Sequence, residues 1–286
     1  MNPQKIAILV DSCTDTPPEL LAREGMYFVP IKIIYADREY EDRIDITPQE
    51  VYDRLEQEVP RTSSPESGHI SAAFEKITAD GYDKVICINI SSALSATYSQ
   101  MALLAKDAEG LDVRVIDTRS IGIGAGMQAI YAHDLVQQGL DIDSICDKVA
   151  QSIRDSRIHF SLSTLDYLAR GGRIGKVSAV LGSLLKIKPI ITCNAEGAYV
   201  IAAKVRGRAQ AIAQTIALAV AAAKDHAHYR VAVVQGNAKE EARHVLSEIR
   251  RLLPDAISFI EGDVSPALVV HTGPGLIGIN VQAIPL

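Results

Sequence analysis

Residues 84–97 read Lys84-Val85-Ile86-Cys87-Ile88-Asn89-Ile90-Ser91-Ser92-Ala93-Leu94-Ser95-Ala96-Thr97. Residues 84–90 form an apolar run rich in β-branched side chains, which is typical of a strand buried on both faces. A loop of hydroxyl side chains follows, and a helical pattern begins near Thr97. A strand that passes through a short polar loop into a helix is half of a parallel β-α-β unit. The stretch therefore predicts an α/β fold.

The same alternation of strands and helices extends through the first half of the chain. Apolar runs predict strands at 5–10, 27–34 and 113–116, and helical patterns lie near 69–79, 97–108, 121–138 and 143–155. Thr47-Pro48-Gln49-Glu50 predicts a further helix start, because Thr47 and Glu50 have capping-box spacing and proline suits the first helical position. Strands that alternate with helices imply a parallel sheet with helices on both faces.

The second half has a different pattern, in which strands follow one another at hairpin spacing. Ile190–Cys193 and Tyr199–Lys204 flank the turn-like residues 194–197, which predicts a hairpin. The other predicted strands are His159–Ser163, Arg230–Gln235, Ile257–Glu261, Leu268–His271 and Ile279–Ile284, and the predicted helices are Val177–Leu185, Gly207–Lys224 and Lys239–Leu252. Hairpin neighbours indicate a mixed sheet. We expect two domains, 1–157 and 158–286.

Composition excludes several classes of protein. A net charge of -6 argues against a nucleic-acid footprint and against a basic membrane-binding face. Tryptophan is absent, so an aromatic platform for stacking bases is not expected. The stretch Ala209–Ala223 is too short for a bilayer and contains Gln210 and Gln214, so stable membrane insertion is not expected. The four cysteines have no zinc-like spacing, and no signal-peptide pattern precedes Asp11. We therefore expect a cytoplasmic protein.

Two glycine-rich stretches resemble nucleotide-binding motifs, but the neighbouring residues that such motifs require are missing. Residues 273–278 match G-x-G-x-x-G, but the chain ends too soon afterwards for the required helix and acidic residue. Residues 171–176 resemble part of a phosphate loop, but Val177 stands where Ser or Thr is needed. No G-x-S-x-G or H-E-x-x-H motif occurs. Asp11 and Asp15 are interpreted as caps at a strand end rather than as metal ligands, and no metal or cofactor is expected.

Two loops are crowded with hydroxyl side chains, residues 62–67 and residues 91–97. A helix that starts after such a loop offers free N–H groups and a partial positive charge, so Ser and Thr donors there make an anion site. In parallel sheets such sites lie at the carboxyl ends of the strands. Arg173 and His271, in glycine-rich turns, are candidate contributors. The alternative is that the hydroxyls only cap helices.

At these residues the sequence resembles the DegV family, which includes the fatty-acid-binding subunits of bacterial fatty acid kinase. The resemblance covers nearly the whole chain. It rests on the order and spacing of several short fragments: Ile8-Leu9-Val10-Asp11-Ser12, Thr62-Ser63-Ser64-Pro65, Ser91 to Tyr98, Leu165-Asp166-Tyr167-Leu168, Gly171-Gly172-Arg173-Ile174, Lys188-Pro189, Lys204-Val205-Arg206 and His271-Thr272-Gly273-Pro274-Gly275. Ser64 stands where the family usually has Gln, and Ala96 where it usually has Gly.

The resemblance implies a Rossmann-like N-terminal domain, a C-terminal α/β domain with a mixed sheet, and a fatty acid buried between them. It implies that Thr62 and Ser95 hold the carboxylate. Arg173 and His271 are expected to line or support that region, as are Ser63 and Ser92. The departures at Ser64 and Ala96 affect neighbouring contacts and leave both anchor hydroxyls in place.

The function implied is that of a carrier for a long-chain fatty acid of about C14–C18, with burial of the acyl chain providing most of the affinity. The carrier is expected to present the carboxylate to a separate fatty acid kinase subunit, and to have no catalytic residue of its own. A serine-dependent hydrolase with Ser95 or Ser63 as nucleophile and His271 as base is the main alternative. A relative of sugar or dihydroxyacetone phosphotransfer proteins is another. We expect a monomer.

Overall fold

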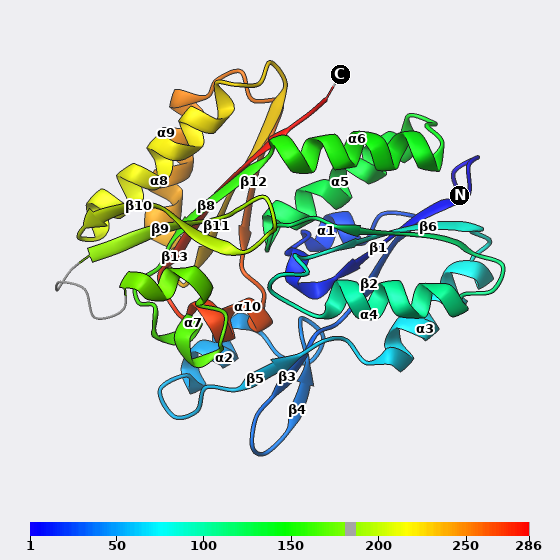
Figure 1. The fold of residues 1–286 in the computed structure, drawn as a ribbon, viewed down its shortest axis with the longest axis horizontal. Helices are drawn as coiled ribbons and strands as arrows, with labels where there is room; N and C mark the ends of the chain where they lie inside the picture. Colours follow the sequence, from blue (N-terminus) through cyan, green and yellow to red (C-terminus); the bar gives the residue numbers. More distant parts are fainter. Residues whose placement is uncertain (181–186, 286) are drawn as a thin grey trace.

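The computed structural model describes residues 1–180 and 187–285. In the N-terminal half, four parallel strands lie in the order β2-β1-β6-β7 (Figure 1). Their bounds are Met26–Val29, Ile6–Asp11, Lys84–Asn89 and Asp112–Asp117. Four helices cover this sheet: α3 (Ser67–Ala79), α4 (Thr97–Leu104), α5 (Ile123–Gln137) and α6 (Ile142–Asp155).

Strand β1 shows why helices cover both faces of the sheet. Successive side chains of a strand point to opposite faces. Ile6 and Ile8 therefore pack into the core that α5 and α6 complete, whereas Ala7 and Leu9 pack into the core that α3 and α4 complete. The predicted parallel sheet with helices on both faces is confirmed.

The C-terminal half is a mixed sheet of six strands in the order β10-β9-β8-β13-β11-β12, in which only the pair of β11 and β12 is parallel. The strands are β8 (Arg157–Ser161), β9 (Ile187–Cys193), β10 (Tyr199–Arg206), β11 (Tyr229–Gly236), β12 (Phe259–Asp263) and β13 (Leu276–Ala283). Helices α8 (Arg208–Ala223) and α9 (Lys239–Leu252) pack on one face. The predicted hairpin is formed by β9 and β10.

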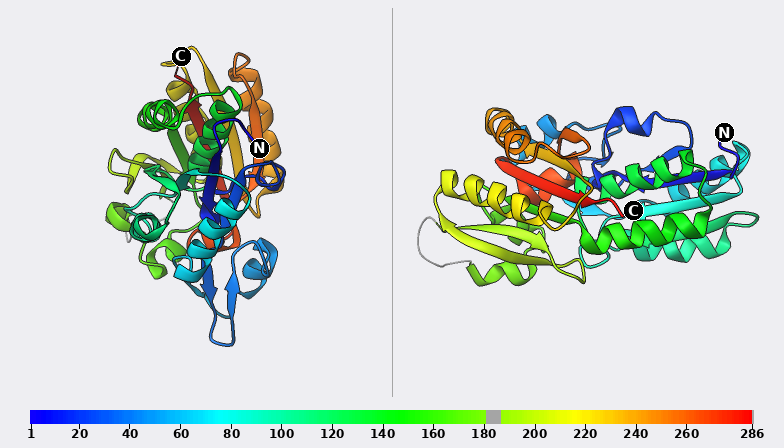
Figure 2. Two further views of the ribbon diagram at one scale, coloured as in Figure 1. Left: turned by 90° about the vertical axis from the view of Figure 1, so that its right-hand side faces the viewer. Right: turned by 90° about the horizontal axis from the view of Figure 1, so that it is seen from above.

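The two sheets lie end to end along the molecule (Figure 2). The end of the chain returns to the N-terminal half, where Ser152 of α6 donates a hydrogen bond of 2.6 Å to the carbonyl of Ala283. The face of the mixed sheet opposite α8 and α9 contributes Phe160 and Val234 to a core that also contains Cys13 and Ile121. This shared core lies where the halves meet. A domain boundary at residue 157 remains a prediction.

A small third sheet was not predicted. It has the order β4-β3-β5, with β3 at Lys32–Ile34, β4 at Glu39–Glu41 and β5 at Arg61–Ser63. The apolar run 27–34 was predicted as one strand, but it is divided between β2 and β3. Pro30 lies at the division and has no N–H to donate to a ladder. Helix α2 (Pro48–Arg54) follows β4, with the predicted capping box between Thr47 and Glu50.

The prediction of a strand at Leu268–His271 is wrong. These residues belong to helix α10 (Pro266–Thr272), which has proline in its first turn. The β-branched Val269 and Val270 suggested a strand, but tertiary contacts decide the conformation. The amide of Ala267 donates to Asp42, and the amide of Ser265 donates to Asp15, both at 2.9 Å. Asp15 and Asp42 are distant from α10 in sequence, so no local sequence pattern predicts this helix.

Short elements complete the described chain: η1 (Ser12–Thr14), α1 (Pro18–Leu21), η2 (Ala105–Asp107), α7 (Asp166–Arg170) and η3 (Gly175–Val180). The helix predicted at 177–185 falls partly on η3, and the rest of it lies outside the described residues. None of the helices within 1–180 and 187–285 has the length and apolar character that a membrane crossing needs.

Candidate functional site

A cavity of about 270 Å³ brings together most of the residues singled out in the sequence. Strand β5 and the loop after it contribute Thr62, Ser63 and Ser64, and the loop after β6 contributes Ser95. Arg173 follows α7, and His271 lies on α10. The carboxyl end of a strand in the parallel sheet and the C-terminal half therefore build one site together, as expected for a fold of this class.

Thr62 and His271 form one of the hydrogen bonds that join the two halves at this cavity. Thr62 Oγ1 lies 2.8 Å from His271 Nε2. Burial, and secondarily the neighbouring Arg173, lowers the pKa of His271 to about 4, so the ring is neutral at pH 7. A ring with hydrogen on Nε2 donates to Thr62 and leaves the Thr62 hydroxyl free to donate to an anion.

Ser95 lines the same cavity from the loop after β6. Its Oγ is 2.8 Å from Thr97 Oγ1 and accepts a weak hydrogen bond of 3.3 Å from the Thr97 amide at the start of α4. Ser95 therefore contributes to the start of a helix and also lines the cavity. Thr62 caps no helix, since it lies within β5, where it pairs with Ile33.

Arg173 connects the glycine-rich turn to the loop after β6. Its Nε donates to the carbonyl of Leu94 at 3.3 Å, and its Nη1 donates to the carbonyl of Gly171 at 2.9 Å. Within the described part of the chain it has no carboxylate partner. A guanidinium without a carboxylate partner at the mouth of a cavity is well suited to attract an anion.

Gly171 is required by the packing of this turn. A Cβ built at Gly171 would lie 2.1 Å from His271 Nδ1, a distance that no side chain can tolerate. The glycine thus allows the turn that carries Arg173 to rest directly on the imidazole. The sequence motif Gly171-Gly172-Arg173 is explained by this close approach.

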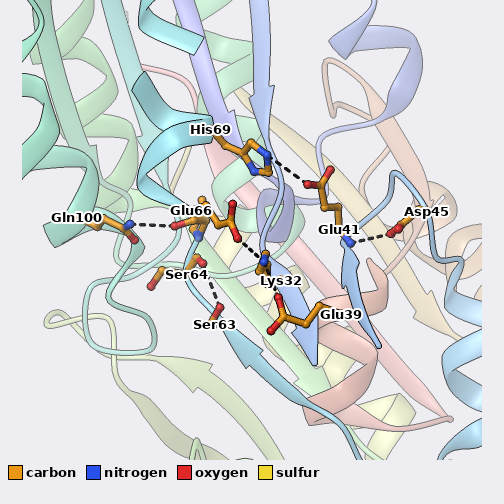
Figure 3. A network of polar contacts seen from close by, with 10 residues as sticks. Lys32, Glu39, Glu41, Asp45, Ser63, Ser64, Glu66, His69 and Gln100 are labelled. Carbon is orange, nitrogen blue, oxygen red and sulfur yellow. Dashed lines mark hydrogen bonds and ion pairs between the residues drawn. The ribbon is translucent and has the colours of Figure 1, made fainter. Parts of the chain in front are cut away.

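A polar network outside the cavity fixes the Thr62 loop (Figure 3). Lys32 of β3 pairs with both Glu39 and Glu66, and Gln100 of α4 donates to the carbonyl of Pro65 at 2.9 Å. Because α4 begins at Thr97, two residues after Ser95, the Gln100 contact holds the two hydroxyl-rich loops at a fixed separation. Sequence reasoning did not identify this network, since its members are far apart in the chain.

Two of the expected supporting residues are placed less favourably. Ser63 is exposed at the rim, and its Oγ donates to the Ser64 carbonyl at 3.2 Å. Ser92 is exposed, donates to Asp117 at 2.5 Å, and is not among the residues that line the cavity.

A second, mostly apolar cavity adjoins the polar one. This smaller cavity of about 30 Å³ shares Ile121, Tyr199, Leu268 and Thr272 with the first. Its further walls come from both halves of the molecule: Asp15, Gly122, Ile123, Ile158, Phe160, Val234, Val264, Leu276 and Gly278. The arrangement therefore leads from hydrogen-bond donors at the surface into the shared core.

Larger hollows occur elsewhere, one of about 410 Å³ beside Arg119 and Arg154 and one of about 580 Å³ beside Glu75. Neither contains the hydroxyls, the histidine or the continuation into the core. We therefore take the cavity of about 270 Å³, lined by Thr62, Ser95 and His271, as the site.

A family model described as "Uncharacterised protein, DegV family" matches residues 5–283. The chain belongs to the DegV family. A DegV domain-containing protein of Clostridium acetobutylicum is 38% identical over 285 residues, which cover 97% of this chain and 99% of the relative. The resemblance stated from sequence is confirmed.

Solved structures of fatty-acid-binding proteins have the same fold. A fatty-acid-binding DegV family protein from Thermus thermophilus is 27% identical, with a TM-score of 0.92 over 99% of this chain and all of that one (100%). A stearic-acid-binding protein from Eubacterium ventriosum is 26% identical, with a TM-score of 0.87 over 97% of this chain and 98% of that one. The predicted two-domain α/β fold is thereby confirmed.

In this DegV family chain the two glycine motifs have structural roles. Residues 273–275 join α10 to β13, and residues 276–278 begin β13, so the motif runs from helix to strand, the reverse of the order in a dinucleotide site. Gly273 has φ of +61°, and a Cβ there would lie 2.2 Å from Tyr167. The interpretation of this stretch as a tight turn with a close backbone approach is therefore supported.

Asp11 acts as a cap. It accepts hydrogen bonds of 3.0 Å from the amides of Cys13 and Ile90. Among the described residues, no group of three or more His, Cys, Asp or Glu side chains is arranged to hold a metal ion.

Proposed function

We propose that this chain binds one long-chain fatty acid of about C14–C18, with the carboxylate at the mouth and the acyl chain in the shared core. The observation that carries the proposal is that two cavities adjoin through shared wall residues, one lined by Thr62, Ser95, Arg173 and His271, the other mostly by apolar side chains. The fatty acids bound by relatives with the same fold support it.

The two cavities are expected to contribute differently to the binding free energy. Burying roughly 15 methylenes at about 0.8 kcal/mol each provides on the order of 12 kcal/mol before association costs are subtracted. A hydrogen bond to the carboxylate adds about 1.5–3 kcal/mol. The apolar interior therefore sets the affinity, while Thr62 and Ser95 select the head group. A cavity of about 30 Å³ is smaller than an acyl chain, so side chains such as Phe160 and Leu268 must move as the chain enters.

The hydrolase alternative lacks a nucleophile and base in contact. Ser95 bonds to Thr97, and His271 bonds to Thr62 rather than to a serine. With its pKa lowered to about 4, His271 is a weak base and is better suited to orienting the Thr62 hydroxyl than to accepting a proton in a triad. We therefore propose a binding protein without catalytic residues and without a cofactor.

The proposed binding is tested by calorimetric titration of the delipidated protein with palmitate, oleate and their methyl esters. The free acids are expected to bind at one site, and the esters more weakly, because an ester has no charge for Arg173 to neutralise and is a weaker hydrogen-bond acceptor for Thr62. Absence of binding by both acids contradicts the proposal.

We further propose that a separate kinase subunit phosphorylates the bound carboxylate. Lys204 and Arg206 on the edge strand β10 are exposed and have no ion pair within the described residues, so they are candidates for steering an acidic partner. The alternative is that they are only solvated. The test is acyl-phosphate formation from ATP, Mg²⁺ and fatty acid with and without a bacterial fatty acid kinase subunit. Product formed by this chain alone contradicts the proposal, and slower turnover with Arg206→Glu supports it.

We also propose that the protein is a cytoplasmic monomer and that its two domains are residues 1–157 and 158–286. The four cysteines are free thiols, which is compatible with a reducing compartment.

A further inference from the structure

The apolar cavity contains a carboxyl group whose presence the proposed function does not explain. Asp15 lines this cavity and is 6% exposed. Its Oδ1 accepts the Ser265 amide, but its Oδ2 is buried and has no hydrogen-bond partner among the described residues. Gly122 also lines the cavity, and a Cβ there would lie 2.9 Å from Asp15 Oδ2. The unpartnered oxygen is therefore held at the cavity wall.

The surroundings offer this oxygen little compensation. Thr272 lines the same cavity, but its hydroxyl donates to the Leu268 carbonyl at 2.9 Å. Apart from Asp15, Thr272 and Tyr199, the side chains of the wall are aliphatic or Phe160. Burial raises the pKa of Asp15 to about 7, and the charge of Arg43, the hydrogen bond from the Ser265 amide and the nearby Ser265 side chain oppose this rise only in part. The ionised carboxylate needs a hydrogen-bond donor, and the protonated carboxyl group needs an acceptor. A plain hydrocarbon chain beside Asp15 supplies neither, so either form would remain without a partner.

We propose that the acyl chain for which this site is adapted carries a hydroxyl group on its hydrocarbon part, and that Asp15 binds this hydroxyl. The inference rests on the proposed fatty-acid function and specifies its ligand as a hydroxylated long-chain fatty acid. A hydroxyl both donates and accepts, so it satisfies Asp15 in either protonation state. Asp15 is then a determinant of ligand specificity inside the core, and Thr62 and Ser95 hold the other end of the ligand.

A single buried water is the competing occupant. A cavity of about 30 Å³ has room for one. A water that stays in place would satisfy Asp15 with any acyl chain, and plain and hydroxylated acids would then bind alike. The two interpretations therefore differ in a measurable preference.

The experiment compares stearic acid with a set of monohydroxystearic acids that carry the hydroxyl at different mid-chain and distal carbons. Dissociation constants are measured for the delipidated full-length protein. At least one hydroxylated acid is expected to bind about ten- to hundredfold more tightly than stearate, as a hydrogen bond to an otherwise unpaired buried polar group implies.

Two substitutions at Asp15 test the assignment. Asp15→Asn keeps a side chain that can pair with a hydroxyl, and is expected to keep the preference. Asp15→Leu is expected to abolish the preference while stearate binds at least as tightly as before. Asp42→Leu is the matched control, because Asp42 accepts the Ala267 amide of the same helix and also has an unpartnered buried Oδ2, but lines neither cavity. This control is expected to retain the preference.

The inference is overturned if no monohydroxystearate binds the wild-type protein more tightly than stearate, which is the result the water interpretation predicts. It is also overturned if Asp15→Leu keeps the preference. If stearate binds while the preference is absent, the proposed function stands and only this inference fails. If neither stearate nor any hydroxylated acid binds, both fail.

Discussion

Replacing Thr62 by valine removes one hydroxyl and keeps the shape of the side chain. In the structure this hydroxyl lies 2.8 Å from His271 Nε2 and lines the mouth of the cavity. If it also donates to the carboxylate, its loss should weaken fatty acid binding by about 1.5–3 kcal/mol, or roughly ten- to hundredfold. The loss of the Thr62–His271 hydrogen bond should cost the free protein about 1 kcal/mol of stability, the low end of the usual range because Thr62 is only half-buried.

A double-mutant cycle separates the head-group contact from general damage. Wild-type and Thr62→Val proteins are titrated with stearate and with methyl stearate. The ester has lost the charge, so the substitution should cost little with it, and the coupling energy should be about 1.5–3 kcal/mol. Ser92→Ala is the control, because Ser92 is exposed and does not line the cavity. Equal losses with both ligands would refute the assignment of Thr62 to the carboxylate.

Further predictions concern the neighbouring residues. Ser95→Ala should weaken fatty acid binding roughly tenfold, and melting measurements should show about 1 kcal/mol of lost stability from the start of α4; unchanged affinity would leave Ser95 as a cap only. Gly171→Ala should lower both stability and affinity, since its Cβ would overlap His271, and a variant that melts like wild type contradicts this packing. Because folding raises the pKa of Asp15 to about 7, the folded state binds more protons than the unfolded state. The resulting stabilisation is complete below the pKa that Asp15 has in the unfolded chain, and it is lost as the pH rises through about 7. The unfolding free energy should therefore rise between about pH 8 and about pH 6 relative to Asp15→Asn, by at most about 1.4 kcal/mol per pH unit, and denaturant titrations with parallel pH dependences for the two proteins would exclude the effect.

The sequence was sufficient where local patterns decide the structure. The middle of β6, Val85–Ile88, is apolar because both faces of the strand are covered, and the hydroxyl-rich loop that follows the strand reaches the cavity as expected. The Thr47–Glu50 capping box and the β9–β10 hairpin are likewise local. Each of these features is stabilised by residues only a few positions apart, which is why a single sequence reveals them.

The parts that escaped prediction depend on distant partners. Helix α10 is stabilised by Asp15 and Asp42, whose side chains accept amides more than 200 residues away in the chain. Gln100 fixes the Thr62 loop through the Pro65 carbonyl, and no periodicity marks such a contact. Asp15 was interpreted from sequence as a cap at a strand end rather than as a metal ligand. Its position in the apolar cavity became visible only once the two halves were placed together.

The most direct test of the central claim is mass spectrometry of what the protein carries after purification from bacteria. Denaturing extraction should release about one equivalent of a long-chain fatty acid of about C14–C18 per chain, since a site of this kind holds one ligand. The extract should include hydroxylated acids where the host makes them. Protein that is reproducibly free of fatty acid, and that takes up neither added palmitate nor added oleate, would contradict the account.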